Sequence, residues 1–362
     1  MAEEKDDIVS YLEKKGAEIN SVILEYISVA SSPRSIEKLL GRSGYKFDHK
    51  ALDEGVLKPS MYILEQGGKR WRPTLMLLII EALGKDPDAY LEFALIPEVI
   101  HNGTLVHDDV EDSSQTRRGQ PAVYIKYGVD VAVNLGDFMY YFPMNALVDS
   151  PKLSEQVKGK ALAIYIKEMT RICIGQATDI IWHKNRIVDP KTITEDKYLE
   201  MANDKTGVLA RMAAKMGGAL AEADDQTIEA LGRFGASIGV AFQIQDDVLN
   251  IYPSGVSANK GGVGDDISEG KITLLVVHAL SKLKNGEGKR LIEILGMHTK
   301  DKALIDEAIA IIDGTGARKY VDKVAVDIVK DAWEGISKRL PESRAKARIK
   351  ALADYLISRT GA

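Results

Sequence analysis

Apolar residues recur at helical spacing along most of this chain, and that pattern restricts its fold more than any other feature. Near the N-terminus, Ile8, Leu12, Ile19, Ile23 and Tyr26 follow one another at steps of three, four or seven residues. Such steps place the side chains on one face of a helix. Alternating strand patterns bounded by turn residues are hard to find. The sequence therefore predicts an all-α fold.

Turn-forming segments separate the helical runs, but no low-complexity linker or repeat of fixed period divides the chain. These segments include SSPRS, DSPK, YPSGVSANKGGVG and DGTG. A length of 362 residues is enough for one large core or for two smaller domains. We expect a single-domain protein, with a catalytic domain over residues 57–362 and an accessory N-terminal helical segment, residues 1–56, packed on it.

The composition indicates an ordinary globular protein and excludes several classes. A formal net charge of −5 gives no support to nucleic-acid binding, which usually shows as a basic excess. The longest plain apolar run, residues 75–80, is far short of the ~20 residues of a membrane span. The single Cys173 fits a reducing compartment, and the acidic N-terminus lacks the order of a signal peptide. We expect a cytoplasmic protein without a transmembrane segment.

A cluster of acids follows an apolar run in the segment LVHDDVEDSSQTRRGQPA. Asp108 and Asp112 are four residues apart and Asp109 and Asp112 three apart, so a helix can present all three carboxylates on one face. Oxygen ligands of this kind suit Mg²⁺, which often joins a few carboxylates to substrate phosphates. A solvated acidic helix end is the alternative explanation for an isolated cluster.

A second acidic cluster favours the metal interpretation. The segment VAFQIQDDVLNIY places Asp246 and Asp247 after another apolar stretch, with Asn250 four residues beyond Asp246. Cations that could bind phosphate form a third set, because guanidinium groups bind phosphate in a bidentate way and lysine acts as a point charge. That set contains Lys69, Arg70, Arg72, Arg117, Arg118, Lys205, Lys260 and Lys271. Together the three sets predict a site for diphosphate substrates.

The same segments make the chain similar to a known family, the trans-type isoprenyl diphosphate synthases. The resemblance runs from about Leu57 to about Leu280, and the matching segments are GGKRWRP, LVHDDVEDSSQTRRGQP, GQATD, KTG, FQIQDDVLN and GDDISEGK, in that order. It implies an all-α isoprenoid-synthase-type helical bundle around a deep central cavity, working as a homodimer. It also implies a prenyltransferase that elongates an allylic diphosphate with isopentenyl diphosphate.

The resemblance further implies a role for each matching residue. Mg²⁺, with Mn²⁺ as a substitute, would be bound directly by Asp108, Asp112 and Asp246, with Asp109 and Asp247 in support. The allylic diphosphate would be bound by Arg117, Lys205, Lys260, Lys271, Gln176 and Asp179. Isopentenyl diphosphate would be bound by Lys69, Arg72, His101 and Arg118. Thr206 and Gln243 would lie close to the allylic cation.

The chain departs from the family pattern in two places. Asn250 ends the second acidic motif where the family usually has aspartate, which affects the outer part of that metal site. The loop between Lys260 and Asp266 is slightly longer than usual, so Lys260 is a weaker assignment than Lys271.

Product length is expected to depend on residues one to two helical turns before Asp108. Thr104 and then Ile100 precede Asp108 at helical spacing, and Gly103 flanks that face. Glycine within a helix costs roughly 1 kcal/mol relative to alanine, so a need for space is one reason for it. Shorter-chain relatives often carry a bulky aromatic here. The small pair Gly103 and Thr104 predicts a product of twenty-five carbons or more, with geranylgeranyl diphosphate as the alternative. The competing explanation is that a side chain from a neighbouring helix closes the hydrocarbon channel and sets the product length.

Three other functions compete with chain elongation. A class I terpene cyclase is also all-α and acid-rich, but it has no need for the basic segments GGKRWRP and RRG. A non-catalytic subunit of a heteromeric synthase would be expected to lose one acidic motif or the arginines. A metal-buffering or scaffold protein would have no use for the basic clusters.

Overall fold

The protein is helical throughout the part of the chain described by this computed structural model, residues 2–29, 33–41, 44–184, 189–253 and 263–358. Within those residues the strands are β1 (Thr116–Arg117) and β2 (Gln120–Pro121), which form one short antiparallel hairpin. The predicted all-α class is therefore confirmed.

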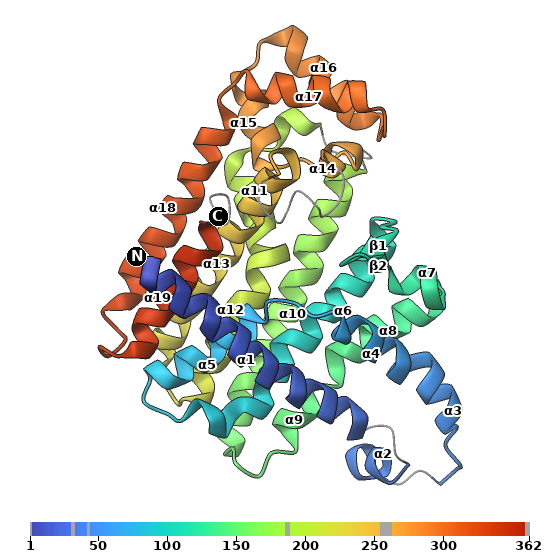
Figure 1. Ribbon diagram of the computed structural model, residues 1–362, viewed down its shortest axis with the longest axis vertical. Helices are drawn as coiled ribbons and strands as arrows, with labels where there is room; N and C mark the ends of the chain where they lie inside the picture. The colour runs from blue at the N-terminus through green and yellow to red at the C-terminus, as the bar shows by residue number, and fades with distance from the viewer. Residues whose placement is uncertain (1, 30–32, 42–43, 185–188, 254–262, 359–362) are drawn as a thin grey trace. The chain divides into compact units, whose positions relative to one another are not determined.

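The elements follow one another along the chain as labelled in Figure 1. The first half contains α1 (Ala2–Val29), α2 (Pro33–Leu40), α3 (His49–Leu52), the π-helical turn η1 (Asp53–Leu57), α4 (Lys58–Glu65), α5 (Trp71–Ala82), the 3₁₀ segment η2 (Pro87–Ala94), α6 (Leu95–Glu111), the hairpin, α7 (Val123–Tyr127), α8 (Val129–Tyr141), α9 (Met144–Val148) and α10 (Glu155–His183). The second half contains the 3₁₀ turn η3 (Pro190–Thr192), α11 (Glu195–Ala202), the π-helical turn η4 (Asn203–Gly207), α12 (Val208–Leu220), α13 (Asp225–Ile251), α14 (Asp265–Ser268), α15 (Leu274–Lys282), α16 (Asn285–Gly296), α17 (Lys302–Asp313), α18 (Ala317–Ser337) and α19 (Arg344–Ile357).

The chain divides into two compact units. Unit 1 consists of Met1–Leu162, Met216–Ala223 and Glu342–Arg348. Unit 2 consists of Ala163–Lys215, Asp224–Pro341 and Ile349–Ala362. The division predicted from the sequence, with an accessory segment over residues 1–56, stays a prediction.

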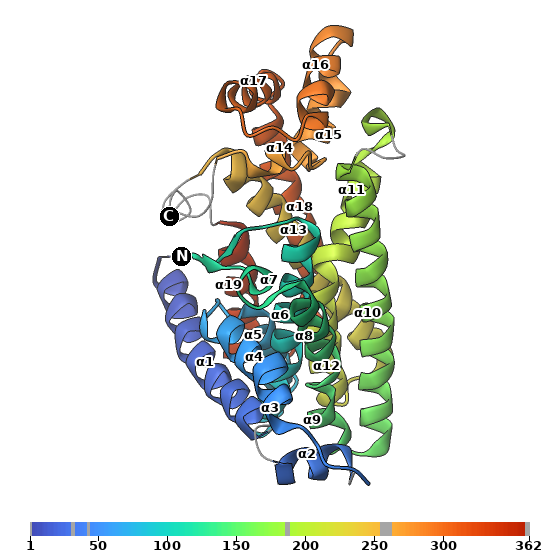
Figure 2. The same ribbon diagram turned by 90° about the vertical axis from the view of Figure 1, so that its right-hand side faces the viewer.

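Unit 1 is organised around α5 and the pair α6 and α8. Every residue of α5 from Trp71 to Ile80 is buried, as expected of a helix that is apolar on all sides. Helices α6 and α8 lie side by side in both ribbon views (Figures 1 and 2). Helix α1 packs against α4, α5, α6 and η2, and it buries the predicted apolar stripe that includes Ile8, Leu12 and Ile19. The first acidic motif lies at the C-terminal end of α6.

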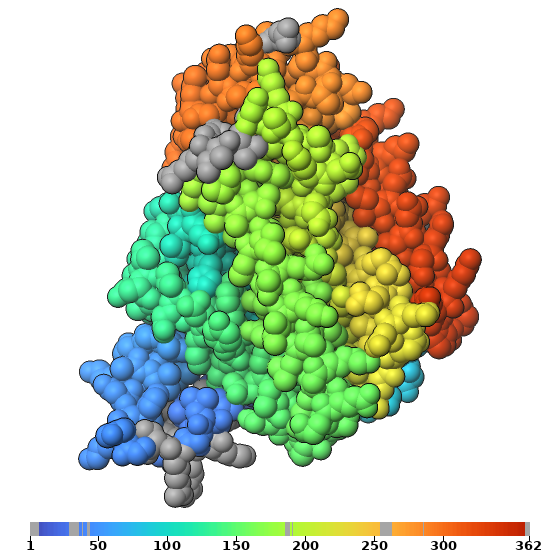
Figure 3. Space-filling model, turned by 180° about the vertical axis from the view of Figure 1, so that it is seen from behind, coloured from blue at the N-terminus to red at the C-terminus, as the bar shows by residue number. Residues whose placement is uncertain are grey.

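Unit 2 is organised around α13, which packs along α18 and also contacts η4, α11 and α15. The first turn of α13 is capped by Asp224, whose side chain accepts a hydrogen bond from the backbone N–H of Thr227 over 2.9 Å. The second acidic motif lies in the last turns of this helix. Figure 3 shows the surface of α10 in green. Ile166 and Ile174 of this helix are exposed.

None of the described helices combines the length and the apolar character needed to cross a membrane.

Candidate active site

The first acidic motif occupies the C-terminal end of α6, where Asp108 and Asp109 form part of the last turn and Asp112 is the C-cap residue. Asp109 is 1% exposed, whereas Asp108 and Asp112 are half-buried. Successive residues of a helix point about 100° apart. Because Asp109 faces the core, the other two carboxylates, four residues apart, share a side of the helix that solvent can reach.

The buried carboxylate of Asp109 is held by Arg117 of the hairpin. Arg117 donates a hydrogen bond from Nε to Asp109 Oδ1 over 2.9 Å and another from Nη2 to the same oxygen. Its Nη2 atom also lies 3.8 Å from Asp108 Oδ2. Burial raises the pKa of Asp109, and the hydrogen bonds from Arg117 oppose that rise. Asp109 therefore orients Arg117 beside Asp108.

Guanidinium groups surround His101 in α6. Arg72 lies in the first turn of α5 and is 6% exposed, while Lys69 is exposed in the preceding loop. Burial, followed by the charges of Arg72 and Arg118, holds the pKa of His101 well below its usual value. A neutral histidine among arginines marks a region of positive potential, which suits an anion. Unit 1 thus brings together three of the residues predicted to bind isopentenyl diphosphate, Arg72, His101 and Arg118.

The second acidic motif resembles the first, because only one of its two adjacent aspartates is accessible to solvent. Asp246 is half-buried, whereas Asp247 is buried and both of its oxygens accept hydrogen bonds. Tyr198 Oη donates to Asp247 Oδ2 over 2.6 Å, and Gln243 Nε2 donates to Oδ1 over 2.7 Å. Thr206 Oγ1 in turn donates to Gln243 Oε1 over 2.7 Å. The predicted pair Thr206 and Gln243 is therefore joined to Asp247.

Burial, with the nearby carboxylate of Asp266, raises the pKa of Asp247 to about 8. A bound divalent cation would favour the ionised form instead. The Asn250 side chain accepts a hydrogen bond from the backbone N–H of Asp266 over 3.1 Å. Asn250 therefore holds the start of α14 in place, which its amide oxygen can do as well as a carboxylate could.

Lys205 lies in the π-helical turn η4, a kind of turn that is frequent at functional sites. Its Nζ atom is 2.5 Å from Asp179 Oδ2, so two of the predicted allylic-site residues form an ion pair. A Cβ atom at Gly175 of α10 would lie 2.4 Å from the backbone nitrogen of Lys205. Only a glycine therefore lets α10 approach this turn so closely.

The other predicted allylic-site residues also belong to unit 2. Gln176 is half-buried in α10. Lys271 Nζ lies 2.5 Å from Glu269 Oε2 and 3.8 Å from Asp266 Oδ1. Lys260 lies outside the described residues.

The sequence did not predict the residues that hold the π-helical turn η4 in place. Buried Arg211 donates to Glu168 over 2.6 Å, to Asn203 Oδ1 over 2.9 Å and to Asp204 Oδ1 over 3.2 Å. Tyr198, described above, was missed in the same way. Glu168 lies 43 residues from Arg211 and Asp247 lies 49 residues from Tyr198, so no local sequence pattern indicates these contacts.

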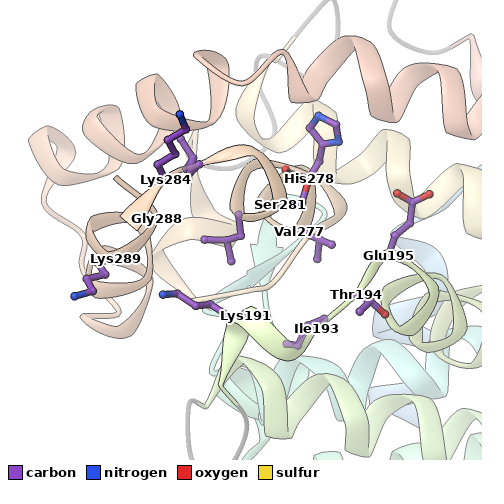
Figure 4. A pocket seen from close by; sticks show the side chains of 12 residues that line it. Lys191, Ile193, Thr194, Glu195, Val277, His278, Ser281, Lys284, Gly288 and Lys289 are labelled. Atoms are coloured by element: carbon purple, nitrogen blue, oxygen red, sulfur yellow. Dashed lines mark hydrogen bonds between the residues drawn. The ribbon is translucent and has the colours of Figure 1, made fainter. Parts of the chain in front are cut away.

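A pocket of about 380 Å³ lies elsewhere in unit 2, along η3, α15 and the start of α16 (Figure 4). Its cations are Lys191, Lys284 and Lys289, whose ammonium groups lie apart in Figure 4 rather than converging on one point. None of the residues predicted to bind substrate lines it.

The chain matches a known protein family over most of its length. The sequence pattern of the polyprenyl synthetase family matches residues 53–312, which include both acidic motifs and their basic partners. The chain belongs to the polyprenyl synthetase family. As such it is a trans-type prenyltransferase, and the predicted enzyme class is confirmed.

Curated and solved members of the polyprenyl synthetase family resemble the chain over most of its length. A short chain isoprenyl diphosphate synthase of Methanothermobacter thermautotrophicus is 38% identical over 84% of this chain and 91% of its own. A geranylfarnesyl diphosphate synthase of Natronomonas pharaonis is 34% identical over 85% and 91%. The structure of a geranylgeranyl pyrophosphate synthetase of Pyrococcus horikoshii, 31% identical, superposes with a TM-score of 0.82 over 98% of this chain and 99% of its own. The predicted isoprenoid-synthase fold is confirmed.

Enzymes of this family use a divalent metal ion. Among the residues that the structure describes, no three acidic, histidine or cysteine side chains are grouped as a complete metal cage. Mg²⁺ is usually bound by one or two carboxylates together with substrate phosphates. Solvent-accessible Asp108, Asp112 and Asp246 have the chemistry for that arrangement.

The surroundings of Gly103 are more crowded than the sequence predicted. A Cβ atom at this position would lie 2.9 Å from Met139 Cβ, 3.1 Å from the backbone oxygen of Gly136 and 3.2 Å from Tyr140 Cδ1. Close packing of α6 on α8 therefore explains the glycine, whereas the sequence suggested room for a hydrocarbon chain. The role of Gly103, Thr104 and Ile100 in setting product length stays a prediction.

Replacing Gly103 by phenylalanine is expected to destabilise the protein as well as to change its products. The aromatic side chain would have to displace the backbone of α8, and overpacking of this kind typically costs about 1–3 kcal/mol or more. Thermal unfolding should show a lower Tm than that of the wild type. An unchanged Tm would mean that α8 moves aside without cost.

Proposed function

We propose that this enzyme condenses isopentenyl diphosphate with an allylic diphosphate to give an all-trans product of twenty-five carbons or more. Synthesis of geranylgeranyl diphosphate is the alternative. The observation that carries the proposal is the pairing of each acidic motif with its own cations. Arg117 is fixed beside Asp108 and Asp109 in unit 1, and Lys205 lies in the turn whose Thr206 is linked to Asp247 in unit 2. A terpene cyclase would need no second diphosphate site.

The proposed reaction begins when the bond between the allylic carbon and its diphosphate breaks. Divalent ions held by Asp108, Asp112 and Asp246 would neutralise the negative charge that develops on the departing diphosphate. Arg117, Lys205 and Lys271 would bind the same group and add fixed positive charge. The oxygens of Thr206 and Gln243 would face the allylic cation, because their orientation is set by the hydrogen-bond chain that ends at Asp247.

The second substrate then supplies the electrons for the new bond. The double bond of isopentenyl diphosphate attacks the allylic cation, and loss of a proton from the adjacent carbon restores a double bond. The product is five carbons longer, and one diphosphate and one proton are released. Lys69, Arg72, His101 and Arg118 would hold the diphosphate of this substrate. Burial, followed by the charges of Arg72 and Arg118, lowers the pKa of His101, so the positive charge in this region is supplied by the arginines.

We further propose that the enzyme is a homodimer that acts in the cytoplasm. Exposed apolar side chains support a partner surface, since large exposed apolar residues often mark an interface. They include Val129, Val133 and Tyr141 on α8, and separately Ile166 and Ile174 on α10.

The function is tested by incubating the purified protein with labelled isopentenyl diphosphate, an allylic primer and Mg²⁺. Reversed-phase chromatography of the dephosphorylated products would then give their length. Elongation supports the proposal. Incorporation that stops after one addition to a fifteen-carbon primer would favour the geranylgeranyl alternative.

Product length is expected to fall when Thr104 is replaced by phenylalanine. Thr104 lies four residues before Asp108 on α6, is half-buried, and donates a hydrogen bond to the backbone oxygen of His101 over 2.7 Å. An aromatic ring one helical turn from the metal-binding acids would obstruct a growing hydrocarbon. Thr104→Val is the matched control, because it removes the hydroxyl without adding bulk and should leave the product unchanged. An active Thr104→Phe enzyme with wild-type products would place the floor elsewhere.

A further inference from the structure

Arg70 is the one charged residue of the GGKRWRP segment that is assigned to neither substrate. Its side chain is 1% exposed, and its backbone is left-handed, with φ of 48° and ψ of 29°. This conformation costs a non-glycine residue roughly 1–2 kcal/mol, so the surroundings must hold it. Arg70 directly follows Lys69 and lies two residues before Arg72, both of which are proposed to bind isopentenyl diphosphate.

All three nitrogens of the Arg70 side chain are bound by different elements. Nε donates to Asn20 Oδ1 of α1 over 2.7 Å, and Nη1 donates to Glu98 Oε1 of α6. Nη2 donates to the backbone oxygen of Leu64 in α4 over 2.8 Å. The loop between α4 and α5 is thereby joined to three helices, α1, α4 and α6, through a single guanidinium group.

The same network continues to Arg118. Asn102 Nδ2 donates to Glu98 Oε1 over 3.1 Å, and Arg118 Nη1 donates to Asn102 Oδ1 over 3.3 Å. Arg118 Nη1 also donates to the backbone oxygen of Gly67, which precedes Lys69 in the loop. A continuous set of hydrogen bonds therefore connects Asn20 through Arg70, Glu98 and Asn102 to Arg118, one of the cations proposed for isopentenyl diphosphate.

We propose that Asn20 is a positioning residue for isopentenyl diphosphate and acts through Arg70. This inference rests on the proposed function, because it takes Lys69, Arg72 and Arg118 as the cations that bind this substrate. Asn20 lies in α1, outside residues 53–312 that match the family pattern. One residue of the N-terminal helix, Asn20, thereby supports the substrate-binding loop, while the rest of the helix packs on the core.

Loss of the Asn20 oxygen would leave a buried, charged N–H group without its acceptor. Such a group costs more to leave unpaired than a neutral one, so Arg70 would shift toward another acceptor. The shift would move the loop that carries Lys69 and the first turn that carries Arg72. Catalysis and binding are sensitive to displacements of about 1 Å at positioned groups, with losses of up to about a hundredfold.

The test is steady-state kinetics of Asn20→Leu in the full-length enzyme. The KM for isopentenyl diphosphate should rise by about tenfold, whereas the KM for the allylic primer should stay within about twofold. Asn20→Asp retains an oxygen acceptor for Arg70 and should restore the KM for isopentenyl diphosphate to near the wild-type value.

Lys15→Met provides a matched control on the same helix. Lys15 Nζ pairs with Asp88 of η2 over 2.8 Å and with Glu18 of α1 over 2.7 Å, and none of these contacts involves Arg70. This variant should lower the Tm while leaving both KM values unchanged. A merely structural role for α1 would instead make Lys15→Met and Asn20→Leu behave alike.

The kinetic results distinguish failure of the positioning role of Asn20 from failure of the proposed function. If the wild type elongates primers and Asn20→Leu leaves the KM for isopentenyl diphosphate unchanged, or raises both KM values equally, the positioning role is wrong and the proposed function stands. If the wild type incorporates no isopentenyl diphosphate at all, both are wrong.

Discussion

Replacing Asp108 or Asp246 by asparagine is expected to reduce turnover by about a thousandfold, because each substitution removes a charged group that we propose binds the metal ions beside the departing diphosphate. Both residues are half-buried and lie beside a more buried aspartate that is occupied by hydrogen bonds. Asparagine preserves the shape of the side chain but binds Mg²⁺ less well. The measurement is kcat at saturating concentrations of both substrates, over a range of Mg²⁺ concentrations.

Asp225→Asn is the control for this prediction. Asp225 is exposed in the first turn of α13, the helix that carries Asp246, so the variant removes the same charge far along the same helix. It should retain wild-type turnover. Circular dichroism should show native helix content in all three variants. Wild-type turnover in Asp108→Asn or Asp246→Asn would falsify the metal assignment.

The sequence contained enough information to predict the fold class and the residue types of the site. Apolar stripes such as that of Ile8, Leu12 and Ile19 became the buried faces of helices. The two acidic motifs lie on helices, as their spacing predicted. These features depend on local periodicity, which the sequence displays directly.

The sequence could not predict which aspartate of each pair faces the core. Asp108 and Asp109 are adjacent, so about 100° of helix rotation separates them, and the rotation of α6 is fixed by its packing on α5 and α8. The same holds for Asp246 and Asp247. An apolar run before such a pair is compatible with either choice.

Polar contacts between residues far apart in the sequence could not be predicted either. Tyr198 reaches Asp247 across 49 residues of sequence, and Arg211 reaches Glu168 across 43. Neither segment has a motif, because one hydrogen bond from a distant helix imposes no local pattern. The space around Gly103 was misjudged for the same reason, since the helix that fills it lies more than thirty residues further on.

Replacing Arg72 by alanine is expected to raise the KM for isopentenyl diphosphate by about 10- to 100-fold, the equivalent of one or two charge-assisted hydrogen bonds to phosphate. The KM for the allylic primer should stay within about twofold. Arg72 is 6% exposed in the first turn of α5, and its charge helps to hold the pKa of His101 low. Removing that charge should therefore raise the pKa of His101, which NMR titration of the histidine side chain would detect.

Arg72→Lys is the matched variant, because it keeps the charge but loses the planar fork that binds phosphate in a bidentate way. It should leave the pKa of His101 close to the wild-type value while recovering only part of the affinity for isopentenyl diphosphate. The two readouts together separate charge from geometry at this position. If Arg72→Ala instead raised only the KM for the primer, the cations of the α5 turn would belong to the allylic site, and the assignment of the two substrates would have to be exchanged.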